Sequence, residues 1–470
     1  MEKNELGVKI GLEVHVSLTT DSKLFCGCST KWQGQEPNSS CCPTCLGMPG
    51  SKPRLNKKAV DYGIKIGLAL NCKIAKEMFF SRKSYFYPDM SKNFQITQYE
   101  MPLCSGGKMK LGSKEIRIRR IQLEEDPARL VHEGISISES KYVLIDYNRS
   151  GDPLCEIVTE PDFENPREAR LFLQKLSAVL EYLGVYDSGI EGSMKVDANI
   201  SIKNGERVEI KNITGFKEVE KALTFEIIRQ GNLLKRGRKV SQETRGFDDV
   251  SGTTILQRTK EFEEEYGYIF EPDLTKIEIE KAHVDKIEKA LPELPDEKIK
   301  KYKKLIGEEL AESIVTDMEL AKMFEIMTKD FEPKLAATWF GNVLKKILNY
   351  NNMRFRDTGI TEAQMSRLLK SLRDDKITPR TAEMILREMV KPGSQEISSS
   401  LESLESAERI GDHSEIRKFV LAALEKNPKA ITDYKSGRNE AFEFIVGQVM
   451  RESKGRADPK LIREVLKEML

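Results

Sequence analysis

Histidine is scarce in this chain, which has four in 470 residues: His15, His132, His283 and His413. A hydrolase of the Ser-His-Asp type would have to use one of them, and none lies in the G-x-S-x-G context that presents such a serine. A P-loop, the glycine fingerprint of dinucleotide-binding folds and the H-E-x-x-H zinc motif are also missing. These absences argue against a hydrolase and against the common nucleotide-binding folds.

Long apolar runs and an excess of charge of either sign are missing as well. Lys and Arg number 76 and Asp and Glu 75, for a net charge of +1, so any basic surface that attracts nucleic acid must be local. The start of the chain, MEKNELGVKI, has neither the apolar core of a signal peptide nor an Arg-rich leader. We therefore expect a soluble, cytoplasmic protein with reduced cysteines, and the chain length predicts about two to four domains.

Residues 9–18, KIGLEVHVSL, predict a β-strand because apolar residues occupy every second position. Glu13 and His15 share the other face, roughly 6 to 7 Å apart. A carboxylate and an imidazole at this distance can share a metal, a phosphate or a proton. An alternating polar face is most often only solvated, so the strand by itself leaves both interpretations open.

Further acidic residues lie in other predicted strands. Residues 116–130, IRIRRIQLEEDPARL, end a strand with Glu124, Glu125 and Asp126, whose charges repel one another unless they share a cation. Hard oxygen donors of this kind suit magnesium. Glu156 lies inside the apolar run PLCEIV, where a carboxylate needs a partner. The alternative is a set of surface acids plus one core glutamate in a salt bridge.

The segment FFSRKSYFYPDMSKNFQITQYE, residues 79–100, is rich in basic, aromatic and amide side chains. This composition disfavours a helix and predicts a binding loop. Its lysines can contact phosphate, while its tyrosines and amides can stack on a base or hydrogen-bond to it. The candidates are Lys83 and Lys92 for phosphate, and Tyr85, Tyr87, Asn93 and Gln95 for a base or an amide.

Five of the eight cysteines fall within residues 26–45. Cys26 and Cys28 form a C-x-C pair and Cys42 and Cys45 a C-x-x-C pair, the paired spacing of knuckle and ribbon zinc sites. Four thiolates complete a tetrahedral site, so we expect a structural zinc that stabilises a polar loop. Two alternatives remain open: Cys41 replaces Cys42 as a ligand, or the cysteines are reduced and hold no metal.

Strand-like segments mixed with short helices predominate up to about residue 290, and helical patterns follow. Residues 141–147 and 154–160 predict two buried strands joined by a Gly/Pro turn. The Ser- and Glu-rich residues 392–406 are the best candidate for a linker.

Capping signals mark the starts of several helices in the second half of the chain. Thr361 with Gln364 predicts a capping box, and Thr378 followed by a proline predicts the start of the next helix. Asp458, also followed by a proline, predicts the start of the last helix.

Several blocks of the sequence resemble, in order, the signature motifs of the GatB subunit of the tRNA-dependent amidotransferase: GLEVHVSL, KLFCGCST, CPTCLGMPGSKPRLN, RKSYFYPDMSKNFQITQYE, LEEDPARL, DYNRSGDPLCEIVTEPDF and GSMKVDANIS. Downstream, EIKNITGFKEVEKALTFEIIRQ and ETRGFDDVSGTTILQRTKE continue the likeness, and GQVMRESKGRADPKL resembles the terminal domain of that family. The resemblance covers essentially the whole chain. It departs at Asp152 and Cys155, where the family usually has apolar residues.

The resemblance implies a fold as well. It implies an α+β catalytic domain over residues 1–290, with the zinc-binding loop and an antiparallel sheet similar to those of glutamine synthetase and guanidino kinases. An all-α helical linker domain is implied over residues 291–405. A small all-α, YqeY-like tRNA-binding tail is implied over residues 406–470.

The reaction implied by the resemblance is ATP-dependent amidation of misacylated Asp-tRNA(Asn), Glu-tRNA(Gln) or both. ATP phosphorylates the side-chain carboxylate and ammonia displaces the phosphate, which requires Mg²⁺ and positioning more than a covalent nucleophile. The implied partners are a separate glutaminase subunit, which delivers the ammonia, a small third subunit, and tRNA. The alternative is a non-catalytic, tRNA-binding scaffold subunit.

The same resemblance implies roles for individual residues. Glu13, His15 and Glu125 are implied as magnesium ligands, with Glu124 as a further catalytic acid and Lys83 on phosphate. Contacts to substrate or phosphate are implied for Arg82, Tyr85, Tyr87, Lys92, Asn93, Gln95, Arg149 and Glu156.

Overall fold

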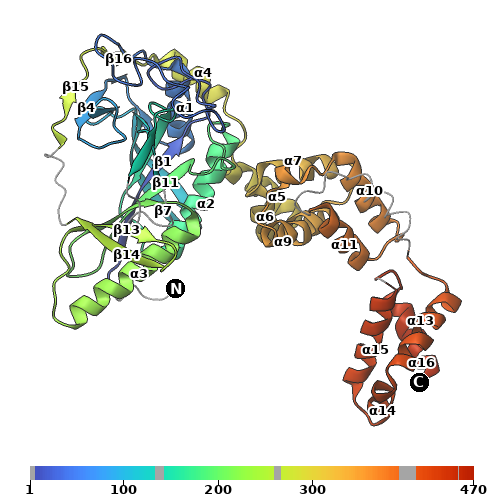
Figure 1. The fold of residues 1–470 in the computed structure, drawn as a ribbon. Helices are drawn as coiled ribbons and strands as arrows, with labels where there is room; N and C mark the ends of the chain where they lie inside the picture. The colour runs from blue at the N-terminus through green and yellow to red at the C-terminus, as the bar shows by residue number, and fades with distance from the viewer. Residues whose placement is uncertain (1–5, 133–141, 259–265, 391–408, 454) are drawn as a thin grey trace. The chain divides into compact units, whose positions relative to one another are not determined.

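The computed structural model describes residues 6–132, 142–258, 266–390, 409–453 and 455–470 (Figure 1). The chain divides into two compact units, Met1–Leu294 and Pro295–Leu470. The first contains the β-sheets, and the second is built from helices. The predicted linker, residues 392–406, lies outside the described residues.

A nine-stranded sheet forms the centre of the first unit, in the order β14-β13-β12-β11-β1-β10-β7-β6-β2. Its strands are β1 (Lys9–Ser17), β2 (Lys73–Ile74), β6 (Cys104–Leu111), β7 (Lys114–Glu125), β10 (Pro153–Thr159), β11 (Met194–Ser201), β12 (Val208–Ile213), β13 (Glu243–Asp248) and β14 (Thr253–Arg258). Strands β12 and β13 pair in parallel, whereas the other neighbours pair antiparallel. The expected antiparallel sheet is therefore a mixed one. Helix α3 (Phe216–Lys235) supplies the crossover that a parallel pair requires.

One face of this sheet is apolar and packs against helices. Val16 of β1, Cys155 of β10 and Leu123 of β7 are aligned across the strands, and all three belong to the core. Helix α1 (Lys57–Ala69) lies on this face, where Gly63 faces Leu123. Helices α2 (Pro166–Tyr182) and α3 also pack along the sheet, as Figure 1 shows. The alternate residues of the same strands project from the opposite face.

The predicted binding loop is held by a smaller sheet in which β15 (Ile269–Phe270), β4 (Ser81–Ser84) and β5 (Phe94–Thr97) pair in that order. A two-stranded ribbon joins β16 (Ile277–Glu278) to β3 (Glu77–Met78), and helix α4 (Lys281–Lys289) follows it. The imidazole of His283 pairs with the Asp61 carboxylate at 2.7 Å and so connects α4 to α1.

The prediction of two buried strands around residues 141–160 is half right. Strand β10 is buried along its whole length and lies within the main sheet. Strand β9 (Val143–Asp146) instead pairs with β8 (Arg129–His132) in a separate ribbon, and Val143 and Leu144 are exposed. An apolar run predicts a strand but does not specify whether a second layer covers it.

The second unit is helical. Its elements are α5 (Pro295–Ile306), α6 (Glu308–Val315), α7 (Met318–Met327), α8 (Pro333–Ala337), a π-helix η3 (Thr338–Leu344), α9 (Lys345–Tyr350), a 3₁₀-helix η4 (Phe355–Thr358), α10 (Glu362–Arg373), α11 (Pro379–Met389), α13 (His413–Lys426), α14 (Pro428–Lys435), α15 (Asn439–Glu452) and α16 (Pro459–Met469). The predicted caps are confirmed, because the side chains of Thr361, Thr378 and Asp458 accept hydrogen bonds from the backbone at the starts of α10, α11 and α16.

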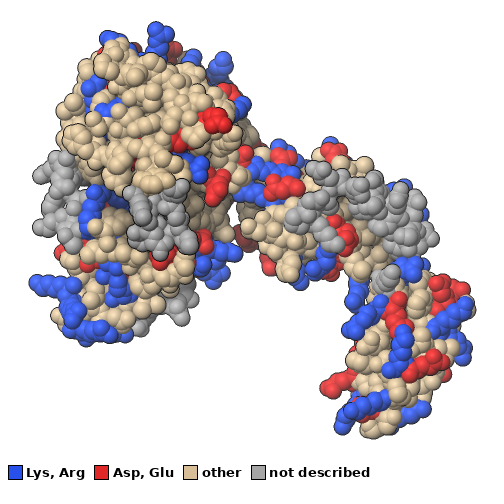
Figure 2. Space-filling view, in the orientation of Figure 1, with Lys and Arg blue, Asp and Glu red and all other residues tan. Residues whose placement is uncertain are grey.

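Helices α13 to α16 share a hydrophobic core of their own, which includes Ile416, Val420, Ile445, Val449 and Val465. On the face shown in Figure 2, basic and acidic side chains are interspersed over these helices. No helix among the described residues is long and apolar enough to cross a membrane.

Candidate active site

Glu13 and His15 each belong to a separate cluster that is rich in carboxylates, called here an acidic group. In both groups the potential ligand atoms all lie within 4.8 Å of one another. The groups are His15 with Glu124 and Glu156, and Glu13 with Asp197 and Glu209. They are separate because β1 has β10 and β7 on one side and β11 and β12 on the other. The prediction that Glu13 and His15 share a face of β1 is confirmed, since their neighbours Val14 and Val16 are buried in the core.

The first group is held together by hydrogen bonds across three strands. His15 Nδ1 lies 2.9 Å from Glu124 Oε1, and Gln122 Nε2 donates to Glu156 at 2.8 Å. Burial lowers the pKa of His15, but the hydrogen bond and charge of Glu124 outweigh that effect and raise it to about 10. Burial, together with the charge of Glu124, raises the pKa of Glu156 to about 7. A protonated His15 therefore offsets part of the negative charge of this group.

The second group contains a lysine in the corresponding role. Lys211 Nζ lies 3.1 Å from Glu209 and 3.5 Å from Asp197. Asn199 donates to Glu13 at 3.0 Å. Burial raises the pKa of Glu13, and the charges of Glu209 and Asp197 raise it further. Each acidic group thus contains one cation of the chain itself, and carboxylate oxygens at this spacing also suit a divalent cation.

Both acidic groups line one pocket of about 1190 Å³. Basic side chains also line it: Lys83, Arg120, Arg129, Arg149, Lys195, Arg207, Lys211 and Arg258. Aromatic side chains come from two segments of the wall: Tyr85, Phe86, Tyr87, Tyr266 and Tyr268. Carboxylates for a metal, cations for phosphate and aromatic rings for a base together suit a nucleotide or a nucleic acid end.

Two family models together match most of this chain. Residues 8–285 match the GatB/GatE catalytic domain, and residues 322–470 match the GatB domain. The chain is 46% identical over 480 residues to the B subunit of the aspartyl/glutamyl-tRNA(Asn/Gln) amidotransferase of Methanospirillum hungatei, with 99% of each chain covered. The chain belongs to the GatB family of amidotransferase subunits. A family member from Caldanaerobacter subterraneus subsp. tengcongensis is 42% identical over 475 residues, with 98% of each chain covered. Both acidic groups lie in the part that matches the catalytic domain.

Most residues that the sequence predicted for a GatB site do line the pocket: Glu13, His15, Lys83, Tyr85, Tyr87, Gln95, Glu124, Arg149 and Glu156. Lys83 Nζ lies 4.5 Å from the centroid of the Tyr266 ring and 5.9 Å from that of Tyr85. Arg149 Nε lies 3.6 Å from the Asp126 carboxylate. Lys83, Tyr85 and Tyr87 of the predicted loop therefore line the same cavity as the acidic groups.

Glu125 lies outside both acidic groups and outside the pocket lining. Its carboxylate lies 2.6 Å from Lys92 Nζ and accepts the backbone N–H of Ile96 at 2.9 Å. Because side chains alternate along a strand, Glu125 shares the phase of Leu123, whereas Glu124 shares the phase of Gln122. The expectation of a magnesium ligand at Glu125 and of a phosphate contact at Lys92 does not fit this pairing, and the geometry favours Glu124 as the ligand.

Two further predicted contacts, Arg82 and Asn93, build the binding loop and do not line the pocket. The Arg82 guanidinium donates to both oxygens of Glu271, at 2.7 and 2.8 Å, and lies 4.3 Å from the centroid of the Phe94 ring. Asn93 adopts a left-handed backbone conformation, with φ of 61°, just before β5. Both residues therefore fix the shape of the loop that presents Lys83 and Tyr85.

The charged pocket residues of this GatB family member that the sequence prediction missed include four near Glu13: Lys195, Asp197, Glu209 and Lys211. Asp197 is aligned with Glu13 in the register of β11 and β1. A signal was present, because MKVDANI and VEIK, residues 194–200 and 208–211, alternate polar and apolar residues as β1 does. A charged residue at a polar position of an alternating central strand therefore indicates a candidate site residue.

The four cysteines predicted as zinc ligands form one cluster, with all four Sγ atoms within 4.8 Å of one another. Cys42 Sγ and Cys45 Sγ are 3.9 Å apart, close to the sulfur–sulfur spacing of a tetrahedral site with Zn–S bonds of about 2.3 Å. A hydrogen bond from Cys26 lowers the pKa of Cys45 to about 4. Cys41 lies outside the cluster, with its sulfur 3.7 Å from Asn148 Oδ1, so the geometry favours Cys42.

Proposed function

We propose that this chain is the amidating component of a multi-subunit, glutamine-dependent amidotransferase that acts on misacylated Asp-tRNA(Asn), Glu-tRNA(Gln) or both. Full-length relatives are named as B subunits of this amidotransferase, and we assign the same role to this chain. The observation that carries it is the pair of acidic groups on β1 in a pocket that also contains basic and aromatic side chains. Such a site suits phosphoryl transfer better than covalent catalysis by a nucleophilic side chain.

The substrate carboxylate must be activated, because ammonia cannot displace an oxide leaving group from it. The terminal phosphoryl group of ATP is transferred to the carboxylate oxygen, and ADP leaves. Ammonia then attacks the acyl carbon, loses a proton, and displaces phosphate to give the amide. Lys83, Arg149 and Lys195 are the basic residues that we assign to the phosphoryl charge.

The donor atoms of both acidic groups fit magnesium, since they are carboxylate oxygens with one imidazole nitrogen within ligand spacing. We assign one ion to His15, Glu124 and Glu156, and a second to Glu13, Asp197 and Glu209. When bound, magnesium neutralises phosphoryl charge and aligns the reacting oxygens. His15 must lose its proton to serve as a ligand, so acid should weaken binding of the first ion.

The remaining roles follow from the family. Ammonia is supplied by a separate glutaminase subunit, and a small third subunit completes the heterotrimer in the cytoplasm. The catalytic part, residues 1–290, shares the sheet arrangement of glutamine synthetase and guanidino kinases in this proposal. Residues 291–405 form a helical domain, and residues 406–470 form the tail that contacts tRNA.

The four-cysteine cluster is assigned a structural zinc. Its sulfur spacing suits a closed tetrahedral site, which leaves no open position for chemistry. The purified chain should contain about one equivalent of zinc, as expected for a single Cys₄ site. If Cys42→Ser retains full metal content, Cys42 is not a ligand and Cys41 is the first replacement to test.

The reaction is tested with the reconstituted complex, ATP, and each misacylated tRNA in turn. Ammonium chloride replaces glutamine, so that the amidation step is measured without the glutaminase. We expect amide formation on at least one tRNA and ATP hydrolysis stimulated by that tRNA. Tight binding of both tRNAs without ATP turnover or amidation would instead identify the chain as a scaffold.

A further inference from the structure

Lys23 is fully buried, with no exposed surface, although it carries a charged ammonium group. Its Nζ lies 3.0 Å from the carbonyl oxygen of Ser40, 3.5 Å from that of Tyr147 and 3.8 Å from Cys45 Sγ. Among the residues that the structure describes, the hydrogen bonds of this ammonium go to these two carbonyls and this sulfur and not to a carboxylate. Asp152 is close enough to feel its charge, but burial raises the pKa of that carboxyl group to about 8. A buried charge is costly unless it is balanced, so the balancing negative charge has to be found elsewhere.

The cysteine cluster supplies that charge when it holds a metal. Four thiolates around a divalent zinc leave a net charge of −2, and partners outside the ligand set commonly stabilise such a centre. We propose that Lys23 is the counter-cation of the four-cysteine zinc site and, with Cys45, connects this site to the turn that carries Arg149 into the pocket. The inference rests on zinc binding by the cluster and does not depend on the amidation reaction.

The connection from the cluster to this turn, residues 147–152, is direct. The carbonyl oxygen of Cys45 accepts hydrogen bonds from the Ser91 hydroxyl at 2.8 Å and the Ser150 hydroxyl at 3.1 Å. Gly151 has φ of +91°, and a side-chain carbon at this position would lie 3.4 Å from Cys45 Cβ and 3.5 Å from Lys23 Cδ. The turn thus packs against both Lys23 and Cys45.

The same turn shapes one wall of the pocket. The backbone N–H of Gly151 donates to the carbonyl of Asp126 at 2.9 Å. Arg149 donates to the carbonyls of Pro127 and Ala128, at 2.9 and 2.7 Å, and its side chain lines the pocket. A shift of the turn would therefore move Arg149 and the strand end at Asp126 together. Lys23 acts here as a positioning residue.

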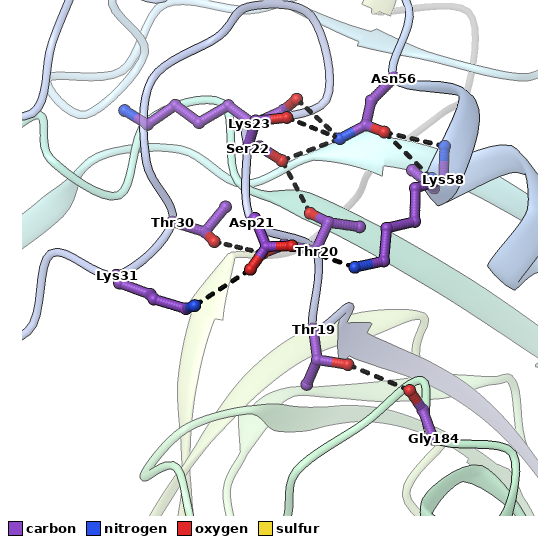
Figure 3. Close-up of polar contacts among 11 residues, drawn as sticks. Thr19, Thr20, Asp21, Ser22, Lys23, Thr30, Lys31, Asn56, Lys58 and Gly184 are labelled. Atoms are coloured by element: carbon purple, nitrogen blue, oxygen red, sulfur yellow. Dashed lines mark hydrogen bonds and ion pairs between the residues drawn. The ribbon is translucent and has the colours of Figure 1, made fainter.

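The loop that contains Lys23 also offers a matched control. Figure 3 shows the start of this loop, where the Asn56 side chain donates to the carbonyls of Ser22 and Lys23, at 2.9 and 3.3 Å. Lys31 lies in the same loop but is exposed, and it pairs with the Asp21 carboxylate at 3.0 Å. Lys31→Met therefore removes the same charge from the same loop without affecting the cluster.

The first experiment measures the rate at which zinc passes from the zinc-loaded, full-length chain to a chromogenic chelator. We expect Lys23→Met to release zinc about 10- to 100-fold faster than the unmodified chain, because losing a partner outside the ligand set typically weakens metal affinity by that factor. Lys31→Met should match the unmodified chain. Equal release rates for Lys23→Met and Lys31→Met, or a purified chain that binds no zinc, would overturn the counter-cation role.

The second experiment needs no variant, so it still tests the connection between the cluster and the turn if Lys23→Met does not fold. Amide hydrogen exchange is compared between the zinc-loaded and the zinc-stripped chain. The amides of Ser150, Gly151 and Asp152 donate hydrogen bonds within or next to the turn, and their exchange should accelerate when zinc is removed. Residues 243–258, at the far edge of the sheet, should not change. Unchanged exchange in the turn would overturn the connection, and neither experiment uses ATP or tRNA, so failure here is distinct from failure of amidation.

Discussion

His15 Nδ1 lies 2.9 Å from a carboxylate oxygen of Glu124, although 109 positions separate the two residues in the chain. They belong to β1 and β7, with β10 between them. His15 is aligned with Glu156 of β10, which in turn is aligned with Gln122 of β7. Glu124 lies two positions beyond Gln122 and projects from the same face, so the three ligand candidates can meet around one cation.

The charge of Glu124 is expected to be essential for amidation. Glu124→Gln keeps the shape of the side chain but removes a charge that would face a bound cation, so ammonia-dependent amidation should fall on the order of a hundredfold or more. Raising the magnesium concentration should restore part of the rate. Glu115 lies on the same strand but pairs with Lys108 at the surface, so Glu115→Gln should keep normal activity. Full activity of Glu124→Gln would exclude the first acidic group from the reaction.

Glu125 is expected to affect stability, not magnesium binding. The side chains of Lys92 and Glu125 are only 9% and 5% exposed, so Glu125→Gln leaves a buried ammonium without its partner. The free energy of unfolding should fall by about 3–5 kcal/mol, measured by urea denaturation, as for other broken buried pairs. The magnesium dependence of the remaining activity should be unchanged. Normal stability combined with weaker magnesium activation would instead restore Glu125 as a ligand.

Asp152 should make the protein less stable as the pH rises. Burial raises the pKa of Asp152 to about 8, although the Trp32 indole donates to it at 2.6 Å, and its other oxygen is buried without a hydrogen-bond partner among the described residues. The unfolded chain releases this proton near pH 4, so the folded state binds more protons over the window from about pH 4 to 8 and loses stability as the pH increases through it.

Asp152→Asn keeps an acceptor for Trp32 and removes the titration. We expect the Tm of the variant to exceed that of the unmodified chain by an amount that grows from pH 5 to pH 8.5, corresponding to a few kcal/mol at the upper end by linkage. Asp21→Asn gives a flat control, because hydrogen bonds from Lys31 and Lys58 lower the pKa of Asp21, so this carboxylate is ionised in both the folded and the unfolded chain and its Tm difference should stay constant from pH 5 to pH 8.5. A Tm difference for Asp152→Asn that does not vary with pH would mean that Asp152 is ionised in the folded protein.

Removal of residues 409–470 should weaken tRNA binding and leave the chemistry intact. These residues include the core shared by α13 to α16 and lie in the part that matches the GatB domain. We expect a higher KM for aminoacyl-tRNA with a nearly unchanged KM for ATP, because contacts to the nucleic acid backbone mainly position it. Binding should be measured at two salt concentrations, and equal tRNA affinity of the two forms at both would exclude this role.

Features that depend only on neighbouring residues were predictable from the amino-acid sequence. The period-two pattern of β1 placed Glu13 and His15 on one face, because alternation is a property of any extended strand. The caps at Thr361, Thr378 and Asp458 were predictable for a similar reason, since each involves a backbone group within a few residues.

Which distant residues come into contact depends on the arrangement of the whole sheet. Nothing local to β1 specifies that β10 and β7 lie on one side of it and β11 and β12 on the other, so the separation of Glu13 from His15 arises only with strand order. Likewise, the run of acids at residues 124–126 does not reveal that Lys92, from another segment, pairs with Glu125 and leaves Glu124 for the pocket. Contacts between distant segments depend on the register of the whole sheet, which short-range sequence patterns do not encode.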